Sequence, residues 1–207
     1  MGWWSERVLP RLNEKTLAAR PVMELRREVC TGLSGRVLEL GYGSGLNADA
    51  YPPAVTAIDA VEPSDVAWGL SEARRARIPV PVRRVGLDGQ RLDARDATYD
   101  AVLSTFTLCT IPDVRAALAE VHRVLRPGGA MHVLEHGSSP DARVATWQRR
   151  MEPLQKRMAG GCHLTRDVPA LLTEVGLVVE RLEQDYLPGP AISKPWAYCY
   201  VVTARKR

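Results

Sequence analysis

The chain has 207 residues, 45% of them hydrophobic and 25% charged, which suits one domain with a substantial buried core (residues 1–207). Its net charge of +4 comes from 28 basic and 24 acidic residues that are interspersed, so we expect no nucleic-acid partner. No apolar stretch is long enough to span a membrane and no leader is evident, so a cytoplasmic protein is expected.

The amino-terminal segment has a helical pattern. We expect one or two helices between Ser5 and Cys30, because Ser5 can cap a helix, Pro10 interrupts one and Pro21 suits a first turn. Residues 1–32 are therefore predicted to form a helical cover over the rest of the domain.

A buried strand, Val37 to Leu40, then leads into three alternate glycines, Gly41, Gly43 and Gly45. Such glycines allow a tight turn and let the backbone approach a ligand closely. A second apolar run, Val55 to Val61, ends in Glu62, whose carboxylate can accept hydrogen bonds from two ribose hydroxyls. This pairing of glycines and acid predicts a β-loop-α-β unit that binds a nucleotide-type cofactor.

Strands and helices alternate along the remaining chain. After Glu62 we expect a helix from Ser64 to Arg77 and then five strands, with further helices between them. The strands are Val80 to Val85, Tyr99 to Thr105, Ala130 to Glu135, and two final ones near Leu177 to Glu183 and Tyr198 to Thr203. A helix from Pro112 to Leu125 ends at Arg126-Pro127-Gly128-Gly129. The alternation predicts an α/β fold with a doubly wound, mostly parallel seven-stranded sheet and ligands at the carboxyl ends of its strands.

The glycine pattern is Glu-x-Gly-x-Gly-x-Gly, which differs from the dinucleotide fingerprint Gly-x-Gly-x-x-Gly because position 46 is leucine. A nicotinamide oxidoreductase is therefore disfavoured. The segment resembles motif I of the class I S-adenosylmethionine-dependent methyltransferases. That resemblance implies S-adenosylmethionine as cofactor, with Glu39 near its methionine end, the glycines under methionine and ribose, and Glu62 on the ribose. Tyr42 either faces the sulfonium or simply walls the pocket.

Further implied cofactor residues follow later strands. By the family pattern, Asp88 accepts the exocyclic amine of adenine and Gly89 and Gln90 lie beside it, although the family usually has Ala and Glu at these last two positions. A solvated loop acid is the alternative for Asp88. Thr105, at the end of its strand, completes the implied cofactor site. The Pro127-Gly128-Gly129 segment also resembles the helix-to-strand signature of the family.

The resemblance extends to a subgroup that includes animal thiol S-methyltransferases and bacterial relatives of ubiquinone and menaquinone methylases. It is carried by Tyr51-Pro52-Pro53, Thr107-Leu108-Cys109-Thr110, Leu134-Glu135-His136 and Gly161-Cys162-His163-Leu164-Thr165-Arg166. We expect no counterpart here of the amino-terminal membrane-anchoring segment of the animal enzymes. The resemblance implies residues 33–136 as cofactor-binding core and 137–207 as acceptor-side helices and final strands.

Methyl transfer by direct in-line displacement requires positioning more than a covalent intermediate. We expect a small-molecule acceptor, either a thiol or a lipophilic compound. A quinone or phospholipid methylase and a non-catalytic S-adenosylmethionine-binding subunit are the alternatives.

Two histidines are candidate catalytic residues. His136 follows a central strand and has a side chain suited to proton transfer near neutral pH, whereas His163 precedes a helix that Thr165 is expected to cap. A satisfied structural histidine is the alternative for His136. The four cysteines show no Cys-x-x-Cys pair, so we expect reduced thiols, no metal site, and Cys162 as a pocket or core residue rather than a nucleophile.

A helix is expected between Asp141 and Met158. Its apolar side chains recur at helical spacing and predict core packing; they are Val144, Trp147, Met151, Leu154 and Met158. Arg143, Arg150 and Arg157 recur every seven residues and are expected on another face, either solvated or in peripheral contact with anionic lipid.

Overall fold

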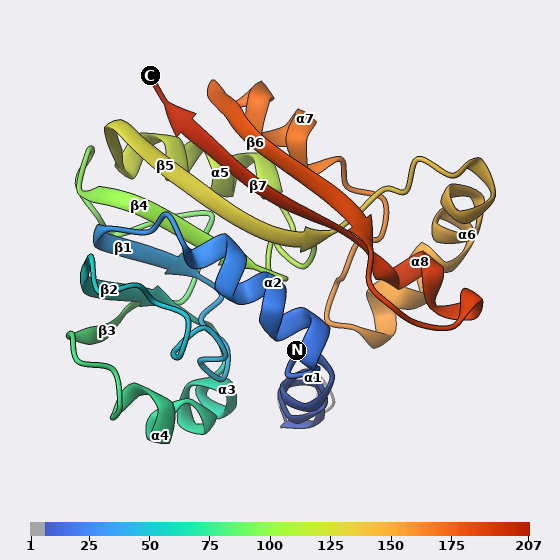
Figure 1. Cartoon of the computed structure of the whole chain (residues 1–207), viewed down its shortest axis with the longest axis horizontal. Coiled ribbons are helices and arrows are strands. Elements are labelled where there is room, and N and C mark those ends of the chain that lie inside the picture. Colours follow the sequence, from blue (N-terminus) through green and yellow to red (C-terminus); the bar gives the residue numbers. More distant parts are fainter. Residues whose placement is uncertain (1–6) are drawn as a thin grey trace.

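The computed structural model describes residues 7–207, which form helices on both sides of one central sheet (Figure 1). The predicted cap Ser5 lies outside the described residues. The strands are β1 (Gly35–Leu40), β2 (Val55–Val61), β3 (Val82–Gly86), β4 (Tyr99–Thr105), β5 (Leu125–His136), β6 (Leu177–Tyr186) and β7 (Tyr198–Lys206). The helices are α1 (Leu9–Leu17), α2 (Arg20–Cys30), α3 (Asp65–Leu70), α4 (Glu72–Arg75), α5 (Val114–Val124), α6 (Ala142–Met158), α7 (Val168–Glu174), η2 (Ala191–Ser193) and α8 (Lys194–Ala197).

The sheet has the strand order β3-β2-β1-β4-β5-β7-β6. β3, β2, β1, β4 and β5 pair in parallel, and β7 runs antiparallel to both β5 and β6. This topology confirms the predicted doubly wound, mostly parallel sheet. The chain order reverses between β1 and β4, and such a reversal opens a crevice at the carboxyl ends of the two strands.

The parallel strands are buried on both faces, which explains their continuous apolar runs. Successive residues of β1 point to opposite sides: Val37 joins the hydrophobic cluster that includes α2, whereas Leu38 and Leu40 join the one that includes α5 and α7. Each fully buried side chain of this size contributes about 1.5–3 kcal/mol to folding. The two clusters hold the carboxyl end of β1 rigidly in the middle of the domain.

The two amino-terminal helices differ in how firmly they are attached. α2 packs against β5 and β7 and starts with Pro21 in its first turn, as predicted. α1 has no buried residue, and Glu14 joins it to Arg74 by a 2.6 Å ion pair. Pro10 lies in the first turn of α1, so the prediction that it interrupts a helix was wrong. No helix within residues 7–207 combines the length and apolarity that a bilayer crossing requires.

One predicted helix end and one predicted strand start, that of β5 at Ala130, were wrong for local reasons. The helix capped by Ser64 breaks at Ser71, where the hydroxyl donates to the Trp68 carbonyl at 2.6 Å, leaving two short helices, α3 and α4. α5 stops at Val124, before the Pro-Gly-Gly segment, and β5 begins at once. Proline disfavours a helical backbone at the residue before it, and Arg126, which precedes Pro127, is extended.

The region around α6 also corrects the sequence predictions. Of its apolar stripe only Val144 is buried, and Trp147 and Leu154 are 57% and 54% exposed, so core packing was wrong for most of the stripe. Gln148 is buried instead, donating to the carbonyls of Gly137 and Pro195 at 2.8 and 3.0 Å. The expected cap Thr165 does not begin α7, because Asp167 accepts the N–H of Ala170 at 3.1 Å.

Candidate active site

A cavity of about 840 Å³ lies at the carboxyl ends of β1, β2 and β4. α1 borders it through Leu9, Pro10, Asn13, Glu14 and Leu17, and the segment after α6 borders it through Ala159, Gly160 and Gly161. The cavity therefore lies where the strand-order reversal predicts a ligand site, beneath the helical cover expected from residues 1–32.

The glycine loop forms one wall of this cavity. Gly41 has φ +70°, and a Cβ there would lie 2.0 Å from the Thr107 hydroxyl, so no larger residue fits. Gly43 has φ +58° and open space where a Cβ would be. Gly45 does not line the cavity; it packs beneath the Tyr42 ring. Gly41 and Gly43 thus expose backbone to the cavity, while Gly45 holds the loop in place.

Glu62 lies directly after β2 and lines the cavity. Its carboxylate accepts the N–H groups of Gly43 and Ser64, each at 2.7 Å, so it ties the glycine loop to the second strand. Burial raises the pKa of Glu62, and these two hydrogen bonds partly offset the effect. Each carboxylate oxygen has a further lone pair for a hydroxyl donor in the cavity.

Tyr42 provides an aromatic wall. Its ring is 2% exposed and lies 5.4 Å, centroid to centroid, from Trp68. The Tyr42 hydroxyl is buried and has no hydrogen-bond partner among residues 7–207. Leaving a buried hydroxyl unpaired costs free energy in the folded state.

Glu39 is fully buried behind the cavity wall rather than on it. Its carboxylate accepts a 2.7 Å hydrogen bond from the Asn47 amide and another from the Tyr51 hydroxyl. Burial raises its pKa to about 7, against the opposing effect of these bonds and of Arg26. The predicted contact with the cofactor's methionine end stays a prediction, and Asn47 connects Glu39 to the residues that do reach the cavity.

Arg26 and Thr105 are those residues. Arg26 is 3% exposed, and its Nη1 donates to the Asn47 side-chain oxygen at 2.8 Å and to the Thr105 hydroxyl at 2.7 Å. Its Nε is buried without a partner among the described residues. Arg26 therefore presents a buried positive charge to the cavity, suited to a carboxylate. Sequence reasoning missed Arg26, although it shares the inward face of α2 with Val22 and Val29.

Phe106 separates this network from the next group of side chains. It lines the cavity, and its ring lies 5.5 Å from the Arg26 guanidinium and 6.4 Å from the His136 ring, centroid to centroid. Its φ of +52° is rare for a bulky residue and costs about 1–3 kcal/mol. A strained aromatic residue at the end of a central strand indicates a functional position, and no sequence pattern predicts it.

The loop after β3 contains Asp88, Gly89 and Gln90, none of which lines the cavity. The Asp88 carboxylate accepts from the Gln90 backbone N–H at 2.8 Å and its side-chain amide at 3.0 Å, and these bonds lower the Asp88 pKa. The Gln90 side-chain oxygen accepts the N–H of Asp113 at 2.8 Å. In this arrangement Asp88 holds Gln90, and Gln90 ties the loop to the start of α5. The contact of Asp88, Gly89 and Gln90 with adenine stays a prediction.

Neither predicted catalytic histidine lines the cavity. His136 ends β5 and its Nε2 lies 3.1 Å from the Cys162 sulfur. The Cys162 thiol has its pKa lowered to about 4 by hydrogen bonds from Cys109 and His136. His163 lies 3.0 Å from Glu152, and burial lowers its pKa. Direct proton exchange between either histidine and a molecule in the cavity therefore has no support in this geometry, and their catalytic roles stay predictions.

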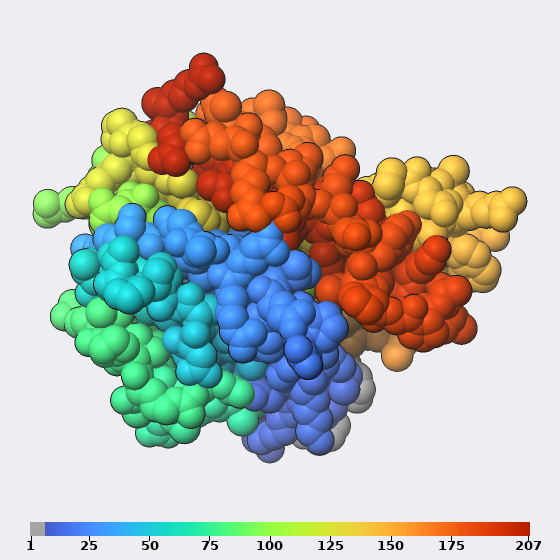
Figure 2. Space-filling view, viewed as in Figure 1, coloured from blue at the N-terminus to red at the C-terminus, as the bar shows by residue number. Residues whose placement is uncertain are grey.

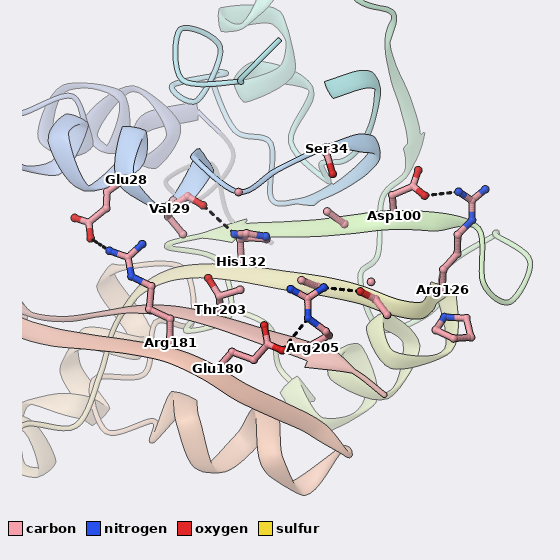
Figure 3. Close-up of a pocket in the computed structure, with 16 residues that line it drawn as sticks. Glu28, Val29, Ser34, Asp100, Arg126, His132, Glu180, Arg181, Thr203 and Arg205 are labelled. Atoms are coloured by element: carbon pink, nitrogen blue, oxygen red, sulfur yellow. Dashed lines mark hydrogen bonds and ion pairs between the residues drawn. The ribbon is translucent and has the colours of Figure 1, made fainter. Parts of the chain in front are cut away.

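A second hollow, of about 510 Å³, lies at the amino-terminal ends of β4 and β5, at the opposite edge of the sheet (Figure 3). Its arginines are already paired: Arg126 with Asp100, Arg181 with Glu28, and Arg205 with Glu180. Ion-paired arginines offer little to a ligand. This hollow also lacks the glycine loop and Glu62, so the site of interest is the larger cavity.

Comparison with known proteins agrees with this geometry. A family model described as "Methyltransferase domain" matches residues 38–149. The chain is 37% identical over 165 residues to a thiol S-methyltransferase of Rattus norvegicus, covering 75% of this chain and 68% of that protein. This chain belongs to the class I S-adenosylmethionine-dependent methyltransferases.

Two further relatives widen the picture. The methyltransferase is 33% identical over 113 residues to a phosphatidylethanolamine N-methyltransferase of Cereibacter sphaeroides, covering 49% of this chain and 51% of that one. Its fold matches the crystal structure of the YcgJ protein of Bacillus subtilis with a TM-score of 0.73 at 17% identity, over 89% of this chain and 97% of that chain. The fold and the cofactor dependence of the methyltransferase are thus shared with its relatives.

The cavity of the methyltransferase fits S-adenosylmethionine. The cofactor carries a ribose for Glu62, a carboxylate for Arg26 and a sulfonium suited to aromatic faces such as Tyr42. It has no pyrophosphate, which agrees with a glycine loop that lacks the dinucleotide pattern. The open space over Gly43 leaves room for the cofactor backbone.

Proposed function

We propose that this methyltransferase transfers the methyl group of S-adenosylmethionine to the sulfur of a small, largely apolar thiol. The observation that carries the proposal is the similarity to a thiol S-methyltransferase along three quarters of the chain. When bound, the cofactor supplies an electrophilic methyl group, and the protein's part is to bring a nucleophile into line with it.

The acceptor side of the cavity supports an apolar substrate. Leu9, Leu17 and Phe106 line it with apolar atoms, and Gly160 and Gly161 leave it room. The nearby acid Glu14 is neutralised by Arg74 at 2.6 Å. A thiol is acidic enough to reach the cavity partly ionised near neutral pH, so in-line attack needs no side-chain base on the cavity wall.

The acceptor is tested by incubating the protein with S-adenosylmethionine carrying a labelled methyl group and with three separate pools: small thiols, phenols with quinones, and phospholipids. We expect label in the thiol pool, with faster transfer to apolar thiols than to charged ones. Label entering only the quinone or phospholipid pool would reject the thiol proposal and leave methyltransferase activity intact.

We also propose that the outer face of α6 makes peripheral contact with anionic lipid. Arg143, Trp147, Arg150, Leu154 and Arg157 follow one another at spacings of four and three residues, and all five are exposed. They therefore share one face, which corrects the sequence prediction that the arginines and the apolar side chains lie apart. Interleaved basic and apolar side chains on an exposed helix are suited to a membrane surface.

The position of this helix supports the same proposal. α6 packs against α8, and together they project at one end of the molecule (Figures 1 and 2). Arg157 and Lys156 also line the cavity, so a lipid surface at α6 would lie next to the acceptor entrance. An apolar acceptor dissolved in the lipid would then have a short path to the site.

Sedimentation with vesicles containing anionic lipid tests the contact. We expect binding that weakens with salt and is reduced in Trp147→Ala and in a variant with Arg150→Gln and Arg157→Gln, while Arg115→Gln on α5 binds as wild type does. If wild type and all variants sedimented equally with the vesicles and salt had no effect, contact of α6 with anionic lipid would be excluded.

A cytoplasmic location is proposed from the cysteines, because Cys30, Cys109, Cys162 and Cys199 are all free thiols. Cell fractionation tests it, and recovery only in an oxidising compartment would contradict it.

A further inference from the structure

Three side chains that can bind a metal meet behind the Phe106 wall. Cys109 comes from the loop after β4, His136 ends β5, and Cys162 lies between α6 and α7. Their sulfur and nitrogen atoms all lie within 4.8 Å of one another, and the His136 to Cys162 distance is 3.1 Å. The three residues are far apart in the sequence, and the fold brings them together.

The spacing of these atoms suits a tetrahedral ion. Zinc binds sulfur and nitrogen at about 2.0–2.3 Å, so two of its ligand atoms lie roughly 3.4–3.8 Å apart. A set of atoms within 4.8 Å of one another therefore needs only small side-chain rotations to share one ion. Two cysteines and one histidine are also the ligand types that zinc and similar soft divalent ions prefer.

The surroundings hold the three residues in place. The Cys109 backbone N–H donates to the buried Glu135 carboxylate at 3.1 Å, and the Cys109 carbonyl accepts the N–H of His163 at 2.8 Å. Cys109 and Cys162 are 2% and 6% exposed, and the His136 side chain is 12% exposed. A preformed, buried set of ligands is what distinguishes a metal site from a chance approach on a surface.

One buried polar atom of the cluster has no hydrogen-bond partner. His136 Nδ1 is buried with no hydrogen-bond partner among residues 7–207, while Nε2 faces a thiol. Protein hydrogen bonds alone thus leave the cluster incompletely satisfied.

We propose that Cys109, His136 and Cys162 form a binding site for a thiophilic divalent metal ion, with zinc as the expected ion. Binding displaces to solvent any proton that the two sulfurs still carry, and the two thiolates balance the charge of the ion. Three protein ligands leave a fourth position for water or another donor. This site goes beyond the methyl-transfer function and contradicts the expectation from cysteine spacing that no metal binds.

Cobalt is a suitable probe because thiolate ligands give its complexes strong charge-transfer absorption. Full-length reduced protein, freed of metal by a chelator, is titrated with Co²⁺ and then with Zn²⁺. We expect a thiolate-to-cobalt band that saturates at one ion per chain and is abolished when Zn²⁺ replaces Co²⁺.

The variants Cys109→Ser, Cys162→Ser and His136→Gln are expected to weaken cobalt binding roughly tenfold or more. Cys30→Ser and Cys199→Ser, which remove equally buried thiols elsewhere, should bind as wild type does. Circular dichroism and S-adenosylmethionine binding report whether each variant is folded, independently of metal.

Absence of a saturating band in reduced wild-type protein would overturn the site. So would a band of equal intensity in a folded variant that lacks both Cys109 and Cys162. Because the readout is spectroscopic, failure of the metal site is distinguishable from failure of the proposed thiol acceptor.

Discussion

At the scale of single residues, we predict that cofactor affinity depends most on the Glu62 side chain. Glu62→Ala removes the carboxylate that is predicted to bind the ribose and also the hydrogen bond to Gly43. Hydrogen bonds to a charged group contribute about 1.5–3 kcal/mol each, so affinity for S-adenosylmethionine should fall roughly ten- to a hundredfold per bond. Equilibrium dialysis with labelled cofactor measures the change.

Asp49→Ala is the matched control for that substitution. Asp49 is an exposed acid near the glycine loop, paired with Arg77 at 3.4 Å, and exposed pairs contribute little. The Asp49→Ala variant should bind S-adenosylmethionine with the affinity of wild type. If Glu62→Ala bound S-adenosylmethionine as tightly as wild type, Glu62 would not be a cofactor-binding residue.

Glu39 gives the protein a specific pH dependence. Its folded-state pKa is raised to about 7 by burial, so the folded state holds a proton that the unfolded chain releases at lower pH. Its stabilising contribution is therefore complete below the ordinary glutamate pKa and is lost as pH rises through about 7.

Urea unfolding of wild type and Glu39→Gln between pH 5 and pH 8 tests this prediction, since glutamine keeps the shape without the titration. We expect the free energy of unfolding of wild type to fall relative to the variant by on the order of 3 kcal/mol as pH rises. Parallel pH curves for the two proteins would show that Glu39 has no raised pKa.

At the scale of elements, α1 is the part of the site that a ligand should affect most. None of its residues is buried, yet five of them line the cavity. We therefore expect α1 to unfold locally at low cost in the absence of ligand, and a bound cofactor to add contacts that stabilise it. Hydrogen exchange should slow in α1 on addition of S-adenosylhomocysteine, and much less in α5, which has five buried residues. Equal protection of both helices, or none in α1, would contradict the role of α1 as a cover.

The elements also show which sequence signals are dependable. The buried strands were predictable because a parallel strand is apolar on both faces, and the cap Ser64 was predictable because its hydroxyl accepts the Ala67 N–H. The apolar spacing on α6 was misleading, since Gln148 rather than Trp147 faces inward. Helical periodicity predicts which side chains share one face of a helix, but tertiary packing decides whether that face is buried or exposed.

At the scale of the whole molecule, the fold and one half of the site follow from local sequence. Gly41, Gly43 and Glu62 are predictable because the backbone turn and the strand end fix their positions. Arg26 and the cluster of Cys109, His136 and Cys162 are not, because side chains from distant segments converge only when the sheet and helices have packed. Residues that meet only in the folded structure have no characteristic spacing in the sequence by which they could be predicted.

The central claim is that the cavity between α1 and the strand ends binds S-adenosylmethionine. Calorimetric titration of the wild-type chain with S-adenosylmethionine, and separately with NADH, tests it most directly. We predict saturable binding of one S-adenosylmethionine per chain and no heat of binding with NADH, because the glycine loop lacks a pyrophosphate cradle. Saturable binding of NADH together with none of S-adenosylmethionine would contradict the account.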